Sequence, residues 1–253
     1  IKFNINNIIM YKTKIIKIFN IKFLDINPAF VSNYFNKKIF LVFPAAPTLA
    51  DISNHKIYHQ ALKKADYAMF DSGYLVLLLR IFKHIKVNKL SGYKFLNLFF
   101  QYLKLNNKKL VFTIDPNKEA SVLNQRYLKK IGVNKINSYI APKYDSLNLQ
   151  DIKLLKEINL IKPDFVLTNI GGGVQEILGL YLKDNLKVKT SIFCTGGAIA
   201  FFTGQQAPIN RFFDNFYLGW FIRILFNPKI FLFRYLKAFR LIFLVIKEKI
   251  VIR

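Results

Sequence analysis

The chain has 253 residues, with 39 Lys and Arg against 14 Asp and Glu, and a formal net charge of +25. Its 53% hydrophobic content excludes a disordered basic tail, and its single cysteine, Cys194, excludes a disulfide scaffold. What remains is a globular protein of about one domain whose basic surface must face nucleic acid, anionic lipid or a phosphorylated substrate.

The first 38 residues carry lysines throughout, and we treat them as an N-terminal extension. This stretch lacks the uninterrupted apolar run of a signal peptide, and no uncharged apolar window of the chain is long enough to predict a transmembrane helix. With one free cysteine and no export signal, the expected compartment is the cytoplasm.

From residue 39, short apolar runs alternate with amphipathic segments of helix length. Strands are expected at 39–43, 67–70, 109–114, 135–140, 164–170 and 188–195, and helices at 51–64, 73–83, 92–105, 118–131, 148–160 and 174–184. Asp51 or Ser53 is expected near the N-cap of the first helix. The near-continuous apolar runs are typical of strands buried on both faces. The sequence therefore predicts a Rossmann-like α/β core over 39–204, with a mostly parallel sheet flanked by helices.

Residues 205–253 differ from this core and predict a basic, amphipathic, helical C-terminal appendage. They hold nine Lys and Arg but two acids, among many aromatic and aliphatic residues. Arg234, Lys237 and Arg240 are three apart and share one helix face. Such a helix can lie in a membrane interface, or it can pack on the domain as an ordinary terminal helix.

Two glycine-rich segments follow predicted strands. In TNIGGGVQE (168–176), Gly171, Gly172 and Gly173 allow a ligand to approach the backbone, and the next helix directs its N–H groups at the same place. Gln175 and Glu176 fall in the first turn of that helix. The pattern suits a diphosphate site, although an ordinary glycine turn explains it equally well.

The second segment, FCTGGAIAFFTGQQAP (193–208), places Gly196 and Gly197 directly after a strand. Parallel strands end at the same edge of a sheet, where open α/β sheets bind ligands. The two glycine turns together therefore favour a binding site more than either does alone.

Asp71 follows the predicted strand in ADYAMFDSG (65–73). A carboxylate at that position can act as a general base toward a sugar hydroxyl, but capping the next helix is the commoner role for an Asp there. Other residue groups give little evidence of chemistry. His55 and His59 lack the Glu of a metalloprotease motif, and Cys194 lies in an apolar strand where it is expected to be inert. The sequence contains no Asp-x-Asp pair that could hold a metal–diphosphate and no nucleic-acid-binding signature. No metal or cofactor is predicted.

The order of these motifs resembles the WecG/TagA/CpsF family of bacterial glycosyltransferases, from about residue 39 to 240. The resemblance rests on ADYAMFDSG, Ser91-Gly92 in KLSGYKFL, KPDFVLTNIGGGVQE, Gly196-Gly197 with Gly204 and Ala207-Pro208, and finally Trp220, Arg223, Pro228 and Arg234. The family transfers a sugar of the N-acetylmannosamine type from a UDP-sugar to a polyprenyl-diphosphate-linked sugar, in the synthesis of teichoic acid, exopolysaccharide and related polymers.

The resemblance implies an inverting, metal-independent enzyme with Asp71 as catalytic base. It implies that Ser72, Gly73, Ser91, Gly92, the two glycine turns, Gln175 and Glu176 bind substrate, and that Arg223, Arg234 and either Arg211 or Arg240 neutralise diphosphate. It also implies a peripheral position on the inner face of the membrane, held through the C-terminal segment and anionic lipid. Nucleic acid is then not a partner, and a homo-oligomer remains open.

The chain departs from the family pattern at several positions. Pro44-Ala45-Ala46 replaces Thr-Pro-Asn, Ile199-Ala200 replaces Phe-Asp, and Gln206 and Gly219 replace an Arg and a Glu. A non-catalytic member that binds lipid-linked sugar or a partner enzyme is therefore an alternative. A basic nucleic-acid-binding protein, suggested by charge alone, is a third hypothesis.

Overall fold

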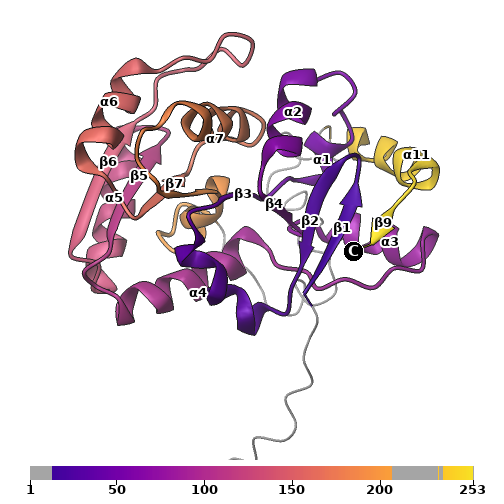
Figure 1. Ribbon diagram of the computed structural model, residues 1–253, viewed down its shortest axis with the longest axis horizontal. Helices are drawn as coiled ribbons and strands as arrows, with labels where there is room; N and C mark the ends of the chain where they lie inside the picture. The colour runs from indigo at the N-terminus through magenta and orange to yellow at the C-terminus, as the bar shows by residue number, and fades with distance from the viewer. Residues whose placement is uncertain (1–12, 207–232, 234–235, 253) are drawn as a thin grey trace, which may run out of the picture.

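The computed structural model describes residues 13–206, 233 and 236–252, and within them a nine-stranded sheet has helices on both faces (Figure 1). Its order is β6-β5-β7-β8-β3-β4-β2-β1-β9. The strands are β1 (Lys14–Ile18), β2 (Ile21–Asp25), β3 (Phe40–Val42), β4 (Tyr67–Met69), β5 (Leu110–Asp115), β6 (Lys135–Ile140), β7 (Phe165–Thr168), β8 (Ser191–Cys194) and β9 (Val251–Ile252).

The helices form two layers with separate apolar cores. One layer holds α1 (Ala46–Leu49), α2 (Lys56–Lys64), α3 (Gly73–Phe82), α6 (Ile152–Ile161), α7 (Val174–Asn185) and α11 (Arg240–Lys247). The other holds the 3₁₀ helices η2 (Pro28–Lys37) and η3 (Gly196–Phe201) with α4 (Gly92–Leu105) and α5 (Lys118–Lys130). Aromatic rings fill the second core, where Phe99 contacts Phe35, Phe165 and Phe193.

The predicted parallel sheet is confirmed. Every neighbouring pair from β6 through β2 is parallel, and every residue of β3, β7 and β8 is buried. The carboxyl ends of these strands therefore lie along one edge of the sheet, which we call the carboxyl edge.

The N-terminal segment contains two strands that the sequence analysis does not predict. β1 and β2 form an antiparallel hairpin whose two-residue turn, Phe19–Asn20, has φ of 54° and 60°. Positive φ at both turn positions matches the twist of the paired strands. β2 also pairs in parallel with β4, so residues from 14 onward belong to the same sheet as the predicted core.

The helix predicted over 51–64 begins later, and neither Asp51 nor Ser53 is its N-cap, although Ser53 lies two residues before it. α2 starts at Lys56 with His55 at the N-cap, while the short helix α1 precedes it. The carboxylate of Asp51 instead accepts from Asn54 and contacts His55 and Arg240.

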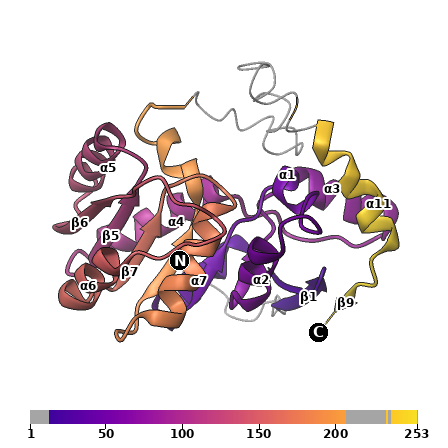
Figure 2. The same cartoon turned by 90° about the horizontal axis from the view of Figure 1, so that it is seen from above.

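The C-terminal helix α11 packs on α3, as both views show (Figures 1 and 2). Leu241 and Val245 are fully buried there, and the Lys83 ammonium donates to the carbonyl oxygens of Ile246 and Glu248, at 2.8 and 2.9 Å. β9 then pairs with β1. On this buried side, α11 therefore packs on the domain as an ordinary terminal helix does. Within the described ranges, no helix is long and apolar enough to cross a bilayer.

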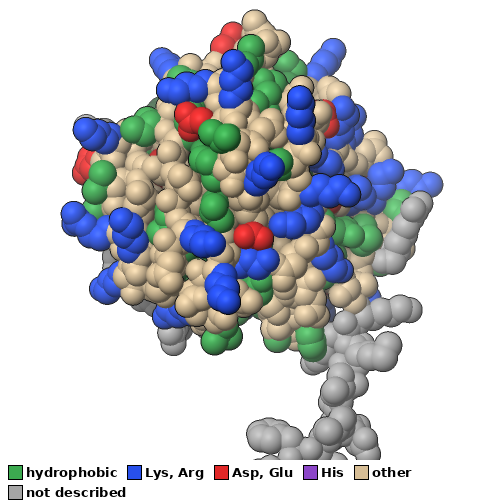
Figure 3. Space-filling view, turned by 60° about the vertical axis from the view of Figure 1, so that its left-hand side comes forward, with side chains coloured by type: hydrophobic (Ala, Val, Ile, Leu, Met, Phe, Trp, Pro, Cys, Tyr) green, Lys and Arg blue, Asp and Glu red, His purple; other side chains and the backbone are tan. Residues whose placement is uncertain are grey.

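The positive charge on one face of the molecule is scattered and not gathered into a patch. Figure 3 shows Lys and Arg side chains across this whole face, with few acids among them. The charge on this face therefore does not by itself mark a binding site.

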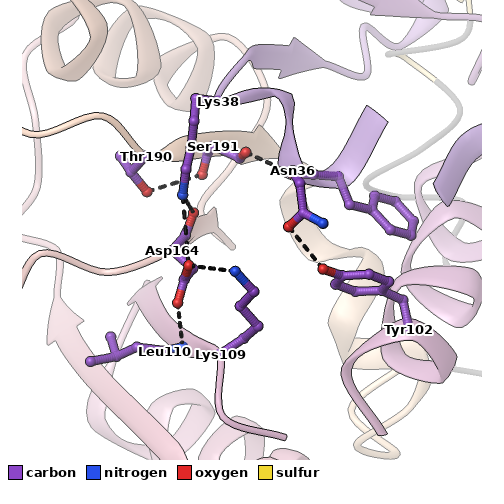
Figure 4. Close-up of polar contacts among 9 residues, drawn as sticks. Asn36, Lys38, Tyr102, Lys109, Leu110, Asp164, Thr190 and Ser191 are labelled. Atoms are coloured by element: carbon purple, nitrogen blue, oxygen red, sulfur yellow. Dashed lines mark hydrogen bonds and ion pairs between the residues drawn. The ribbon is translucent and has the colours of Figure 1, made fainter. Parts of the chain in front are cut away.

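At the opposite, amino edge of the sheet, Asp164 joins the beginnings of several strands (Figure 4). Its carboxylate accepts from the Lys109 ammonium at 2.9 Å and from the Leu110 N–H at 3.0 Å, and Lys38 lies 3.7 Å away. The backbone bond from Leu110 and the adjacent Lys109 charge hold the pKa of Asp164 below its usual value, against the opposing effect of burial.

We expect Asp164→Asn to lower the free energy of unfolding by about 1 kcal/mol at pH 7, because it removes a charge-assisted contact with Lys109 and the Leu110 N–H. Since the pKa of Asp164 is lower in the folded chain than in the unfolded chain, this contribution is present above pH ~4 and is lost as the pH falls further. Urea denaturation at pH 7 and pH 3 measures both effects. Asp184→Asn, at an exposed 3.5 Å pair with Lys64, is the control and should change little. Equal losses for both variants would contradict the assignment.

Candidate active site

Asp71 lies at the carboxyl edge, two residues after β4. Ser72, and not Asp71, caps α3, because the Ser72 hydroxyl accepts from the Leu75 N–H at 3.2 Å. The alternative that Asp71 is a helix cap for α3 was therefore wrong. The Asp71 carboxylate instead accepts a 2.8 Å bond from the N–H of Gly92, the first residue of α4.

This contact places Asp71 at the positive end of α4. The N–H groups of a helix's first turn favour a negative charge, so the ionised carboxylate is stabilised there. Ser91 caps the same helix by accepting from the Lys94 N–H, and Gly73 is the first residue of α3. The residues predicted around Asp71, namely Ser72, Gly73, Ser91 and Gly92, thus form two adjacent helix beginnings.

Gly92 allows the start of α4 to lie close to the segment that follows β8. A Cβ at this position would lie 3.2 Å from the Ala198 Cβ and 3.3 Å from the Thr195 carbonyl oxygen. This contact joins the start of α4 to the segment after β8, so Asp71 and the second glycine turn lie close together.

The first glycine turn joins β7 to α7 and is held by Glu176. The Glu176 carboxylate accepts from the Gly173 N–H at 2.6 Å and from the Gln175 amide at 3.0 Å. Gly173 has φ of 94°, which a side chain would oppose. At Gly171 and Gly172 no atom lies within 4 Å of where a Cβ would be, so space opens above the N-terminus of α7.

The two glycine turns contact each other through Gln175. A Cβ at Gly196, whose φ is 60°, would lie 3.2 Å from the Gln175 amide nitrogen. At Gly197, a Cβ would lie 3.0 Å from the Gln206 amide. The structure thereby brings together Asp71, Gly92, both glycine turns, Gln175 and Glu176, in one chain of contacts along the carboxyl edge.

Glu176 is a buried carboxyl group with unusual titration. Burial raises the pKa of Glu176 to about 7, and the nearby Asp71 charge adds to the effect, although three hydrogen bonds oppose it. Its side chain is 1% exposed. A group that changes protonation near neutral pH beside a candidate base is a common feature of enzyme active sites.

The arginines that the sequence analysis assigns to the diphosphate are not among the residues that the structure describes at this edge. Arg223 and Arg234, with Arg211, fall outside the described residues, as does the departure at Gly219. Arg240 is on α11, with its guanidinium 3.4 Å from the Asp51 carboxylate. Ala46 begins α1 and Ala200 lies in η3, so both departures place apolar side chains near this edge.

The sequence analysis missed a polar network on the same edge. Asp115 is buried there and accepts hydrogen bonds from the buried side chains of Asn124, Asn169 and Thr113. The available signal was a polar residue at the end of an apolar strand, in TIDPN and again in LTNI. Over the described ranges, no group of His, Cys, Asp and Glu is arranged to hold a metal ion.

Comparisons with known proteins agree with the motif order. The sequence model described as "Glycosyl transferase WecG/TagA/CpsF family" matches residues 16–253. Relatives from Staphylococcus aureus strains NCTC 8325 and COL, each named N-acetylglucosaminyldiphosphoundecaprenol N-acetyl-beta-D-mannosaminyltransferase, are 22% identical over 205 residues. The alignment covers 79% of this chain and 77% of each relative.

We expect the buried Glu176 to make stability fall with pH. Its pKa is higher in the folded chain than in the unfolded chain, so the folded state binds more protons between pH ~4.5 and ~7, and wild type loses stability over that window. Glu176→Gln removes this titration. Its unfolding free energy should rise relative to wild type by about 1–3 kcal/mol from pH 5 to pH 8.

Urea denaturation at unit pH steps measures the difference between the two proteins. Glu119→Gln, at an exposed position in the first turn of α5, is the matched control and should follow wild type. A constant difference between Glu176→Gln and wild type across this range would refute the raised pKa.

Proposed function

Because the chain belongs to the WecG/TagA/CpsF family of glycosyltransferases, we propose that it transfers an N-acetylmannosamine-type sugar from a UDP-sugar to a polyprenyl-diphosphate-linked sugar. The Staphylococcus aureus relatives are named for such an acceptor and such a sugar. The product would enter a cell-surface polysaccharide such as teichoic acid or exopolysaccharide.

One observation carries the proposal: Asp71 lies at the N-terminus of α4, on the same edge as the glycine turn that opens α7. A base must be ionised to accept a proton, and the Gly92 N–H favours the ionised form. Asp71 then takes the proton of the acceptor hydroxyl as that oxygen attacks the anomeric carbon of the donor sugar.

The leaving group is the diphosphate of UDP, and its bond to the sugar breaks as the new one forms. A single displacement of this kind inverts the anomeric centre. The exposed backbone of Gly171 and Gly172, at the N-terminus of α7, can donate to the phosphate oxygens where negative charge develops. We assign the remaining neutralisation to Arg223 and Arg234 in place of a metal ion.

The acceptor is anchored in a membrane, and α11 supplies a surface that suits one. Opposite its buried face, Phe239 is 55% exposed, Phe243 67% and Ile246 47%. Ile81 and Phe82 are also exposed at the end of α3, next to Lys83, which binds the last carbonyls of α11. Exposed apolar side chains beside Lys237, Arg240 and Lys247 are typical of helices that lie at an anionic bilayer surface. The proposed location is the inner face of the cell membrane.

Asp71→Asn should reduce sugar transfer by about 100-fold or more, because the amide cannot accept the hydroxyl proton. UDP binding should be retained, since the proposed role of Asp71 is toward the acceptor hydroxyl and not toward UDP. The assay measures UDP release with UDP-N-acetylmannosamine and a polyprenyl-diphosphate-linked N-acetylglucosamine acceptor, and calorimetry measures UDP binding.

Asp145→Asn, in an exposed loop, serves as the control. Full turnover by Asp71→Asn would exclude it as the base. If wild type releases no UDP with any of a panel of UDP-sugars, the non-catalytic alternative suggested by Ala46 and Ala200 is favoured instead.

Membrane association can be tested on α11. Replacing Phe239 and Phe243 together with Ser should reduce co-sedimentation with phosphatidylglycerol vesicles several-fold, because two exposed rings no longer enter the interface. Leu160→Ser is the control, since Leu160 is 81% exposed. It belongs to α6, which lies at the opposite end of the sheet from α11 (Figure 1). Equal vesicle binding by the double variant and wild type would place the membrane contact elsewhere.

A further inference from the structure

A buried carboxylate at the end of β5 organises part of the carboxyl edge that the proposed reaction does not use. Asp115 is fully buried. One of its oxygens accepts from the side-chain amides of Asn124 and Asn169, each at 2.7 Å, and the other accepts from the Thr113 hydroxyl at 2.7 Å. Asn124 comes from α5, and Asn169 directly follows β7. The network therefore joins two strands and a helix.

The charge of Asp115 fixes how both amides are turned. A carboxylate only accepts, so each Asn must present its NH₂ group to Asp115 and direct its carbonyl oxygen elsewhere. Neither of these two carbonyl oxygens has a hydrogen-bond partner within the described structure, and both are buried. An unpaired buried acceptor is costly, so each is a place where a donor would be bound favourably.

The side-chain amides of Asn124 and Asn169 differ in their surroundings. Asn124 belongs to a helix on the outside of the sheet and is 1% exposed. Asn169 is 5% exposed and lies two residues before Gly171, where the chain opens above the N-terminus of α7. The backbone N–H of Asn169 also donates to the Ile114 carbonyl, which fixes the position of Asn169 relative to the end of β5. Of the two amides, Asn169 is therefore the one next to the glycine turn that is assigned to the diphosphate of the nucleotide.

We propose that Asn169 is a specificity-determining residue, whose carbonyl oxygen accepts a hydrogen bond from the nucleoside part of the donor substrate. Asp115 is a positioning residue that keeps the amide of Asn169 turned this way. The inference rests on the proposed use of a UDP-sugar. The group that Asn169 recognises is a hydrogen-bond donor, and we take it to be either the imide N–H of uracil or the 2′-hydroxyl of ribose.

Calorimetry with three ligands distinguishes these two sources: UDP, N3-methyl-UDP, which lacks the imide N–H, and 2′-deoxy-UDP, which lacks one hydroxyl. Wild type should bind one analogue more weakly than UDP. Asn169→Ala should raise the Kd of UDP by about 3- to 10-fold, the size of one neutral hydrogen bond, and leave the Kd of that analogue unchanged. Asn137→Ala, at an exposed site on β6, should behave as wild type.

Asp115→Asn provides the second variant, because it is isosteric and leaves Asn169 in place. Without the carboxylate the amide can turn, so this variant should lose the preference between UDP and the sensitive analogue. Thermal unfolding of each protein checks that it folds. If Asn169→Ala does not fold, Asn169→Ser is measured in its place, because its hydroxyl can still donate to Asp115 while the amide carbonyl is lost.

The inference is overturned if Asn169→Ala binds all three nucleotides as wild type does, or if it weakens all three equally. Retained discrimination in Asp115→Asn would overturn the positioning role. Failure of the proposed function looks different: wild type itself would then not bind UDP, and the proposal for Asn169 would fall with it.

Discussion

Parallel pairing between β7, β8, β3 and β4 is the constraint on which the candidate site depends. Parallel neighbours all end on one side, so residues that are a hundred positions apart in sequence meet at the carboxyl edge. Asp71 and the turn at Gly171–Gly173 are joined in this way, by way of Gly92, Thr195 and Gly196. The small size of Gly92 matters here, because a side chain would push α4 away from the end of β8.

The two edges of the sheet stabilise their carboxylates differently. At the amino edge Asp164 is paired with lysines, and Asp66, just before β4, pairs with Lys183 at 2.8 Å. At the carboxyl edge, Asp115 and Glu176 are held within the described structure by amides, a hydroxyl and backbone N–H groups. Neutral donors therefore satisfy the Asp115 and Glu176 carboxylates, and neither carboxylate is paired with a Lys or Arg of the described structure. Positive charge for an anionic ligand can then come from helix N-termini and from arginines elsewhere in the chain.

How far the sequence could predict this structure depends on the range of the interactions involved. Strands such as 135–140 and helices such as 92–105 follow from local periodicity, and their predicted bounds agree with the structure. The hairpin of β1 and β2 was missed because lysines on its exposed side interrupt the apolar pattern. Asp71 could be identified as a candidate but not distinguished from a cap, because that depends on Gly92, twenty-one residues away. The pairing of Asp115 with Asn169 spans fifty-four residues, and no local pattern encodes it.

The attachment of α11 links the proposed membrane contact to the candidate site. Lys83 holds the end of α11, the Glu248 carboxylate accepts from the Phe19 N–H at 2.7 Å, and β9 pairs with β1, so the helix is fixed to the sheet at several points. Near its other end, Arg240 contacts Asp51, which follows α1, and α1 begins just beyond the carboxyl end of β3. The apolar face of α11 is therefore held by elements that also border the carboxyl edge. In the proposed reaction, an acceptor whose lipid tail stays in the bilayer needs such a fixed geometry, because its sugar hydroxyl would have to reach Asp71 while the tail remains anchored.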